Sequence, residues 1–331
     1  MDTFIVAEIG TNFLNDQKLG RALIVDAACA GANAIKTQLY QADRLAAVDS
    51  PLYWEGRGTQ REAFAEFDKL DLQEHLKLLR FAEHLGLVAY STPFDLQSVD
   101  VLESWGVPIF KIASADITYH ELLRRVAKTG RPIHLSTGAS TLAEVGEAIG
   151  VLMEEGTTDL TLLGCTLTYP CPDEDANLSQ LYDLSQFGFP IGYSDHTQSV
   201  IIPSLAVAMG AMVIEKHLGD SLLSGADNGW SLGREGFLNM VLMIRGAEKI
   251  VGVQGKMVLP SEEKAKRFAR RSLATLRDVR PGEIVDESTI TALRPGTGIP
   301  AREFPSYRGR VFSRTITAGV LLNKSDVIVE E

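Results

Sequence analysis

Cationic and hydroxyl side chains recur where short apolar segments of this chain end. Two of these positions hold lysines, Lys36 and Lys111, and others hold the hydroxyl residues Thr92, Ser114 and Ser136. Ammonium groups supply charge and hydroxyls supply directed hydrogen bonds, so the set suits a phosphate or carboxylate ligand. A single lysine at such a position is usually a surface residue whose charge reaches water, but two lysines beside hydroxyls favour an anion-binding site.

Two histidines, His196 and His217, end the last two apolar segments. Neighbouring strands lie about 4.8 Å apart, so two imidazoles at adjacent strand ends can share one ion. Together with water or substrate oxygens they suit Mn²⁺, Fe²⁺ or Zn²⁺ in an open catalytic site, whereas two unconnected histidines are the alternative interpretation. Glu8 ends the first segment and could serve as a ligand or as a general acid/base.

The other histidines and the cysteines are less informative. His134 lies one layer deeper than Ser136 on the same strand face, so we expect it in the core. Helical segments hold the other three histidines, which we expect to face solvent: His75, His84 and His120. The cysteines are odd in number and match no zinc or CxxC pattern, which indicates a reducing compartment, the cytoplasm.

Eight apolar segments alternate with helical patterns. The expected strands are Phe4–Ile9, Asn33–Gln38, Leu87–Ser91, Pro108–Ala113, Pro132–Ser136, Leu160–Cys165, Pro190–Ser194 and Ala211–Glu215. The expected helices are Lys18–Ala30, Leu72–Leu85, Leu96–Trp105, Tyr119–Lys128, Leu142–Glu154, Leu178–Phe187, Ser199–Met209 and Arg234–Val251. This alternation indicates a parallel sheet, and eight units over about 250 residues favour an α/β fold of the (β/α)8 barrel type, with catalytic residues at the carboxyl ends of the strands. A doubly wound open sheet is the alternative, but no glycine-rich phosphate motif opens the first unit.

One connection of the expected barrel is unusually long. From Leu39 to Leu70 the chain carries Tyr40, Tyr53, Trp54, Arg57 and Arg61. Loops of this length are uncommon unless they are functional. We therefore expect either a substrate lid or a structural excursion that closes one face of the barrel.

The pattern changes near residue 255, which predicts three parts. Residues 1–255 form the catalytic barrel, residues 256–271 a charged linker or solvated helix, and residues 272–331 a small β-rich domain with short strands between Gly- and Pro-containing turns. The chain has 331 residues, 45% of them hydrophobic, and a net charge of −11. This composition excludes a disordered chain and disfavours nucleic acid and anionic membranes as partners. No signal peptide or membrane-spanning segment is evident.

The strand ends, taken in order, resemble the sialic acid synthase family. The motifs are AEIGTN, KTQ, STPFD, FKIAS, LSTG, CTLTYP, YSDHT and EKH, followed by GADN at 225–228 and LRPGTGI at 293–299. The resemblance extends over essentially the whole chain. It implies a (β/α)8 TIM barrel followed by a small SAF (antifreeze-like) domain.

The resemblance also implies an activity. The family condenses phosphoenolpyruvate with the open-chain aldehyde of an N-acetylated amino-hexose, releases phosphate and makes nonulosonic acids. A divalent metal, Mn²⁺ or Mg²⁺, is required, and by resemblance His196 and His217 would hold it. The catalytic residues would be Glu8, Lys36, Lys111 and Asp227, and the substrate-binding residues would be Gln38, Thr92, Ser114, Ser136, Tyr169 and Arg294. The family is a domain-swapped homodimer, so Arg294 would reach the active site of a partner subunit.

Four positions depart from the family pattern: Phe13, Gly164, Leu167 and Asn228. We expect each change to remove a polar or rigid group near the sugar, which favours a less polar acceptor. A related barrel synthase that uses a sugar phosphate is one alternative function. A non-catalytic carbohydrate-binding paralogue is the other, although retention of the charged residues argues against it.

Overall fold

A computed structural model of the chain describes residues 2–54, 56–220, 222–223, 225, 227–252 and 255–328. The chain divides into two compact units, Met1–Gly252 and Val253–Glu331. Among the described residues, no helix is both long and apolar enough to cross a bilayer.

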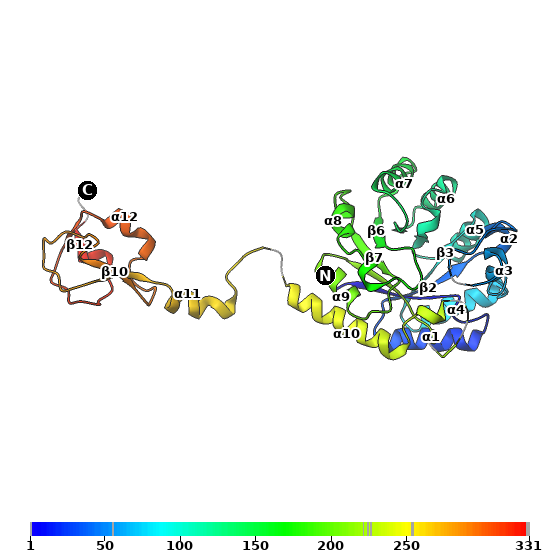
Figure 1. Ribbon diagram of the computed structural model, residues 1–331, viewed down its shortest axis with the longest axis horizontal. Coiled ribbons are helices and arrows are strands. Elements are labelled where there is room, and N and C mark those ends of the chain that lie inside the picture. The colour runs from blue at the N-terminus through cyan, green and yellow to red at the C-terminus, as the bar shows by residue number, and fades with distance from the viewer. Residues whose placement is uncertain are drawn as a thin grey trace. The chain divides into compact units, whose positions relative to one another are not determined.

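The first unit is a closed barrel of eight parallel strands surrounded by helices (Figure 1). The strands are β1 (Phe4–Gly10), β2 (Ala34–Leu39), β3 (Val88–Pro93), β4 (Phe110–Ile112), β5 (Ile133–Ser136), β6 (Leu160–Cys165), β7 (Ile191–Asp195) and β8 (Val213–His217). They pair in chain order, and β8 pairs with β1 to close the ring. All eight expected strands are therefore confirmed, and so is the barrel.

The helices that surround the strands also match the expected set. They are α1 (Gln17–Ala30), α4 (Leu72–His84), α5 (Leu96–Trp105), α6 (His120–Ala127), α7 (Leu142–Glu154), α8 (Gln180–Ser185), α9 (Ile202–Ala208) and α10 (Arg234–Val251). Local signals explain the boundaries of α5: the Asp95 side chain accepts from the Ser98 amide, and Gly106 ends the helix in the left-handed region. The β4 strand is shorter than expected because Pro108 has no N–H to donate to a neighbouring strand.

The expectation that His75 faces solvent is wrong. His75 is only 4% exposed, and its Nε2 lies 2.7 Å from the Thr37 hydroxyl of β2. The helix α4 turns this residue toward the barrel, next to Leu78 and Leu79 in the buried face. By contrast, His84 and His120 are exposed and His134 is buried, as expected.

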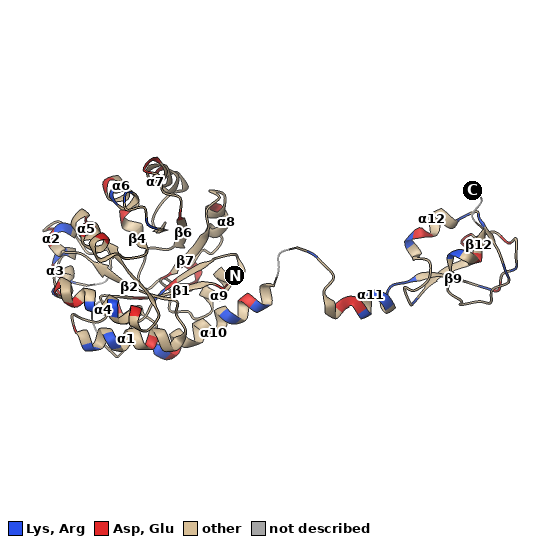
Figure 2. Cartoon of the chain, turned by 180° about the vertical axis from the view of Figure 1, so that it is seen from behind, with Lys and Arg blue, Asp and Glu red and all other residues tan. Residues whose placement is uncertain are grey.

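The second unit has its own core, built from residues such as Leu273, Val285 and Phe312. Two small antiparallel sheets form it: β9 (Ser272–Thr275) with β10 (Ile290–Leu293), and β11 (Val311–Phe312) with β12 (Val327–Ile328). It also contains two α-helices, α11 (Glu263–Ala269) and α12 (Phe304–Tyr307). No residue of α11 is buried, and charges of both signs follow one another along it (Figure 2). Within the segment expected to be a linker or a solvated helix, Glu263–Ala269 form an exposed helix.

Candidate active site

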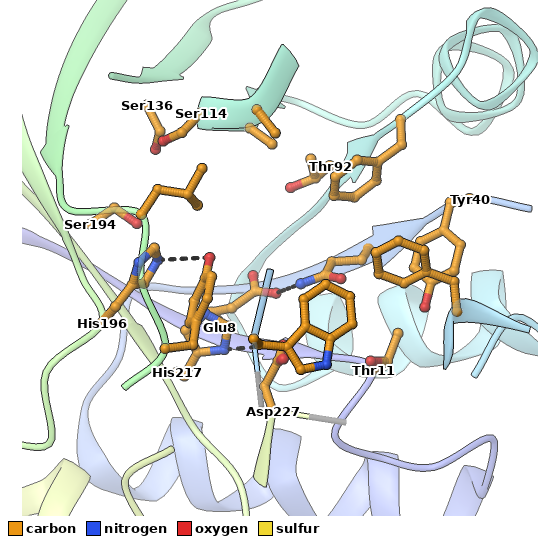
Figure 3. A pocket seen from close by; sticks show the side chains of 18 of the residues that line it. Glu8, Thr11, Tyr40, Thr92, Ser114, Ser136, Ser194, His196, His217 and Asp227 are labelled. Carbon is orange, nitrogen blue, oxygen red and sulfur yellow. Dashed lines mark hydrogen bonds and ion pairs between the residues drawn. The ribbon is translucent and has the colours of Figure 1, made fainter. Parts of the chain in front are cut away.

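A cavity of about 560 Å³ lies at the carboxyl ends of the barrel strands. Its walls come from the last residues of the strands and from the loops that follow them (Figure 3). Every predicted site residue except Arg294 lines it: Glu8, Lys36, Gln38, Thr92, Lys111, Ser114, Ser136, Tyr169, His196, His217 and Asp227. Arg294 follows β10 in the second unit, so its role stays a prediction.

Strand pairing explains why Glu8 lies at the junction between the lysines and the histidines. Its Cα is the register partner of Lys36 on one side and of His217 on the other. Its carboxylate forms an ion pair with Lys36 and accepts a hydrogen bond from Gln38 Nε2 at 3.1 Å. Burial raises the pKa of Glu8 to about 7 despite the adjacent Lys36 ammonium. A carboxyl group with this pKa can give and take a proton near neutral pH.

The two predicted cations and the predicted hydroxyls line the same cavity. Lys36 Nζ donates to Thr92 Oγ1 at 2.9 Å, and both lysines are almost fully buried. Burial disfavours the Lys36 ammonium, but the carboxylates of Glu215 and Glu8 outweigh it, so the pKa of Lys36 is raised. The pKa of Lys111 is lowered, because burial outweighs the attraction of Glu215 there. Two buried cations beside three hydroxyls fit a multiply charged anion.

Glu215 is a site residue that the sequence analysis did not select. Its Oε1 lies 3.7 Å from Lys36 Nζ and 3.8 Å from Lys111 Nζ, and it accepts a hydrogen bond from Ser194 Oγ at 3.1 Å. Burial opposes its charge, but the Lys111 and Lys36 ammoniums hold the pKa of Glu215 below its usual value. The signal that could have found it is strand alternation, because Glu215 shares a strand face with His217.

The two histidines lie close together, as the strand spacing predicted. Their ring centroids are 5.6 Å apart. His196 Nδ1 lies 2.9 Å from the Thr166 carbonyl, which only accepts, so Nδ1 carries the proton and Nε2 has a lone pair. Tyr169 Oη lies 3.2 Å from that Nε2, and His217 Nδ1 lies 3.5 Å from Asp227 Oδ2 (Figure 3).

Both imidazoles have the protonation state that a metal requires. Burial lowers the pKa of His196 to about 4 and that of His217 well below its usual value. An imidazole whose second nitrogen donates to a backbone carbonyl is a common arrangement in metal ligands. No cluster of three or more His, Cys, Asp or Glu side chains within the described ranges has the geometry to hold an ion. The pair offers two imidazole nitrogens, and water or substrate oxygens would have to complete the coordination of an ion.

Cys165 lies next to the histidine pair but is poorly suited to nucleophilic chemistry. Its Sγ is 3.6 Å from His196 Nδ1. Burial raises the pKa of this thiol to about 12, so it stays protonated at neutral pH. A protonated thiol is a weak nucleophile and a weak ligand.

Besides Glu8, two acidic residues on the cavity wall have raised pKa values. Burial raises the pKa of Asp227 to about 6, although the nearby Lys36 ammonium and a hydrogen bond from Gln38 both act to lower it. Asp116 follows β4, and burial raises its pKa to about 7. Asp116 Oδ2 is buried and has no hydrogen-bond partner among the described residues. The sequence analysis missed Asp116, since nothing in the local pattern distinguishes it from a surface aspartate.

The long connection after β2 contributes an aromatic wall to the cavity. It contains two short helices, α2 (Ala42–Leu45) and α3 (Gln60–Phe64). Its cavity-lining aromatic residues are Tyr40, Tyr53, Trp54, Phe64 and Phe67. Successive rings contact one another, with centroids 5.5 Å apart for Tyr40 and Phe64 and 5.7 Å apart for Trp54 and Phe64. Arg57 and Arg61 do not belong to the described lining of the cavity.

The expectation that all four departures lie near the sugar is wrong. Within the described part of the chain, Leu167 lines the cavity, whereas Phe13, Gly164 and Asn228 do not. Phe13 packs against His75, and a side chain at Gly164 would meet Leu181 of α8. Asn228 is fully buried and donates to the Asn12 carbonyl at 3.1 Å, so it shapes the loop after β8. These three positions therefore pack behind the cavity wall and are not part of its described lining.

Comparison with known proteins agrees with this geometry. The model of the NeuB family matches residues 23–256, which is most of the barrel. This chain belongs to the NeuB family. The model of the SAF domain matches residues 270–328, so the predicted two-part architecture of a NeuB-family barrel and a SAF domain is confirmed.

Relatives of this NeuB-family chain carry the names of nonulosonic acid synthases. The chain is 36% identical to N,N'-diacetyllegionaminic acid synthase of Campylobacter jejuni, over 97% of this chain and 99% of that protein. It is 33% identical to pseudaminic acid synthase of Helicobacter pylori, over 98% and 97% of the two chains. The crystal structure of the N-acetylneuraminic acid synthetase of Leptospira borgpetersenii superposes with a TM-score of 0.73 at 33% identity, over 80% of this chain and 90% of that one. The prediction of an enzyme of the sialic acid synthase family is thus confirmed.

Proposed function

We propose that this NeuB-family enzyme condenses phosphoenolpyruvate with the open-chain aldehyde of an N-acetylated amino-hexose and releases phosphate. The observation that carries the proposal is that one cavity holds two buried lysines, three hydroxyls and two neutral imidazoles around Glu8. Lys36 and Lys111 would bind the phosphate and carboxylate of phosphoenolpyruvate, with Thr92, Ser114 and Ser136 as hydrogen-bonding partners.

In the proposed reaction the aldehyde oxygen of the acceptor gains one proton, and the water that adds later releases one proton. The methylene carbon of phosphoenolpyruvate forms a bond to the aldehyde carbon, and the aldehyde oxygen takes a proton. Water then adds to the carbon that bears the phosphate, and phosphate departs with cleavage of its C–O bond. Glu8 is suited to both transfers, because its pKa of about 7 lets it donate a proton and later accept one. Holding two substrates in one cavity also supplies a large part of the rate.

His196 and His217 would hold a divalent metal, Mn²⁺ or Mg²⁺. When bound, the metal supplies Lewis-acid polarisation of the acceptor carbonyl. The chain's own contribution is to keep both imidazoles neutral and to orient His196 through Thr166. Asp227 and Tyr169, which contact these histidines, would face the sugar together with Gln38.

The acceptor that fits best carries apolar substituents. Leu167 and the aromatic residues of the long connection, such as Trp54 and Phe64, line the same cavity. Methyl groups, as on acetamido or deoxy positions, gain from contact with such a wall. The name of the legionaminic acid synthase relative supports an acceptor with two acetamido groups.

We also propose that the enzyme is a homodimer in the cytoplasm, with Arg294 of one subunit serving the site of the other. All three cysteines are free, which is compatible with a reducing compartment. The acidic net charge of −11 leaves nucleic acid and membranes as poor partners.

The test of the proposed function is a panel of acceptors incubated with phosphoenolpyruvate and Mn²⁺. Acceptor binding, phosphate release and product mass are measured for N-acetylmannosamine, for diacetamido-trideoxy-hexoses and for a sugar phosphate. We expect release only with an acceptor present, and a product mass equal to acceptor plus pyruvate. Acceptor binding without phosphate release across the panel would instead indicate a non-catalytic paralogue, and release only with a sugar phosphate would indicate the related synthase.

A further inference from the structure

A buried ion pair lies directly behind the two histidines. Lys216 Nζ donates to Asp195 Oδ2 at 2.6 Å, and the two side chains are 1% and 0% exposed. Asp195 and Lys216 are register partners on β7 and β8. Side chains alternate along a strand, so this pair faces away from the cavity, whereas Ser194, His196, Glu215 and His217 line it. The pair thus joins the two strands at the level of the histidines.

The same ion pair organises the backbone that follows His196. Lys216 Nζ also donates to the Thr197 carbonyl and, at 3.3 Å, to the Ser199 carbonyl. Asp195 accepts from the Thr197 amide at 3.0 Å and from its hydroxyl at 3.2 Å. The residues on both sides of His196 are therefore bonded to one buried network, and His217 directly follows the lysine at its centre.

A buried ion pair is weak evidence for added stability, because loss of hydration offsets the attraction between the charges. What this network does supply is geometry, since an ammonium group with four oxygen neighbours has few alternative positions. The His196 ring itself has three polar contacts, with the Thr166 carbonyl, the Tyr169 hydroxyl and the Cys165 thiol. Besides the strand pairing, the segments that carry the two histidines are joined by the bonds of Lys216 to Asp195, Thr197 and Ser199, by the Ser194–Glu215 bond and by the contact between the two imidazoles.

We infer that Asp195 and Lys216 are positioning residues that fix the separation and orientation of His196 and His217 for a shared divalent ion. The inference rests on the proposed metal role of the two histidines. It assigns the pair no contact with substrate or with the reacting atoms.

A matched contact elsewhere in the barrel separates positioning from general stability. Thr37 also faces outward, between the cavity residues Lys36 and Gln38, and it bonds to His75 of α4 at 2.7 Å. Both residues are buried. Because this contact lies behind β2, its loss removes a buried hydrogen bond without touching the strands that carry the histidines. His75→Gln is therefore the control variant.

The experiment measures Mn²⁺ binding to the full chain by the electron paramagnetic resonance signal of free Mn²⁺, with thermal unfolding measured on the same samples. The variants are Asp195→Asn, Lys216→Met, the double variant Asp195→Leu/Lys216→Met, Thr197→Val, His75→Gln and His217→Ala. We expect about 10–100-fold weaker Mn²⁺ binding in the two single variants of the pair, as is typical when groups that orient metal ligands are lost. His75→Gln should lower the midpoint of unfolding and leave the Mn²⁺ affinity within twofold of the parent.

The double variant gives the decisive comparison. Replacing both charges by apolar side chains removes the uncompensated charge, so stability should recover relative to the single variants, while Mn²⁺ binding stays at least 10-fold weaker than in the parent. Parent-like Mn²⁺ affinity in a folded double variant overturns the inference. If the charge variants do not fold, Thr197→Val decides, since it keeps the ion pair and removes the bonds of the Thr197 hydroxyl to Asp195, Lys216 and the Ser199 amide. A Mn²⁺ affinity at least threefold weaker than that of the parent supports the inference, and an affinity within threefold of the parent overturns it.

His217→Ala separates this inference from the proposed function. If His217→Ala loses Mn²⁺ binding while the double variant binds Mn²⁺ like the parent, the positioning role of Asp195 and Lys216 is refuted and the metal role of the histidines stands. Retention of full Mn²⁺ binding in His217→Ala removes the metal role of the histidines as well, and with it both proposals.

Discussion

Lys111 Nζ and Glu215 Oε1 lie 3.8 Å apart, and both side chains are almost fully buried. Glu215 makes a similar approach to Lys36, so one carboxylate supports the charge of both lysines that line the cavity. Its removal should lower the pKa of Lys111 further, because burial already acts against that ammonium.

Glu215→Gln is therefore expected to weaken phosphoenolpyruvate binding. We predict a roughly 10-fold higher KM for phosphoenolpyruvate at pH 8, as expected from losing about 1.4 kcal/mol of charge-assisted binding. Activity should recover as the pH falls, because the Lys111 amine regains its proton. The measurement is kcat/KM for phosphoenolpyruvate as a function of pH. Ser194→Ala, which removes the hydrogen bond to Glu215 and keeps the charge, is the control and should shift the profile far less.

Gly10→Ala should abolish activity with a modest loss of stability. Gly10 has a φ of +46°, and a Cβ there would lie 2.8 Å from Glu8 Oε1 and 3.0 Å from Gln38 Nε2. The added methyl would displace the proposed acid/base carboxyl group, so we predict a fall in kcat of more than about 100-fold, or ~2.7 kcal/mol. Gly86→Ala is the matched control, because Gly86 has a φ of +83° and no described atom within 4 Å of the added Cβ. It should show the backbone strain of roughly 1–2 kcal/mol in unfolding experiments and normal kinetics.

His75 makes the stability of the barrel depend on pH. Burial lowers the pKa of His75 to about 4, whereas an unfolded chain has a histidine pKa of about 6.5. Above pH 6.5 neither state binds the proton, and below it the unfolded state binds first, so stability falls as the pH drops from 6.5 to 4. The contribution is about 3 kcal/mol over this window.

His75→Gln should therefore flatten the dependence of the free energy of unfolding on pH between 6.5 and 4. At pH 7 it should also lower that free energy, because the buried ring loses its contacts with Thr37 and Phe13. Denaturant unfolding at a series of pH values measures both quantities. His84→Gln on the exposed side of the same helix is the control and should leave the pH dependence unchanged. An equally steep dependence in His75→Gln would contradict the assignment.

Leu167→Asn should change acceptor preference. Leu167 is the departure from the family pattern that lines the cavity. An amide in its place loses apolar contact and gains hydrogen-bonding groups, so the ratio of kcat/KM between a diacetamido-trideoxy-hexose and N-acetylmannosamine should fall by about 10-fold. Leu142→Asn, at a position that is 50% exposed on α7, should leave the ratio unchanged. Identical ratios in the Leu167 variant and the parent would remove Leu167 from the acceptor site.

Arg294 can be tested by complementation between subunits. We predict that Arg294→Ala and His217→Ala chains are each inactive alone, and that mixing them after mild dissociation restores up to about a quarter of the parental activity. Recovery follows because one of the two sites in a mixed dimer combines intact residues from both chains. The absence of recovery in mixed dimers verified by mass would show that each site is built from one chain.

The local patterns of the sequence were sufficient for the strands, the helices and most of the cavity. Strand ends are marked by residues such as Glu8, Lys36 and His217 because the parallel barrel brings all carboxyl ends to one rim. Strand alternation has a period of two, so which residues share a face with Lys36 or His217 is a local property. The charge of the segment that contains α11 and the β-rich character of the second unit were equally evident, since composition and turn residues are local too.

Tertiary structure alone decided which of these residues meet. The contact of Glu215 with both lysines, the burial of His75 against Thr37, and the ion pair between Asp195 and Lys216 join segments far apart in the chain. Such contacts depend on strand register and on closure of the barrel, and no local pattern encodes them. For the same reason only the fold could show that Leu167 faces the cavity while Phe13, Gly164 and Asn228 support the backbone. The sequence determined the chemistry available at the rim, and the register of the closed sheet determined which groups act together.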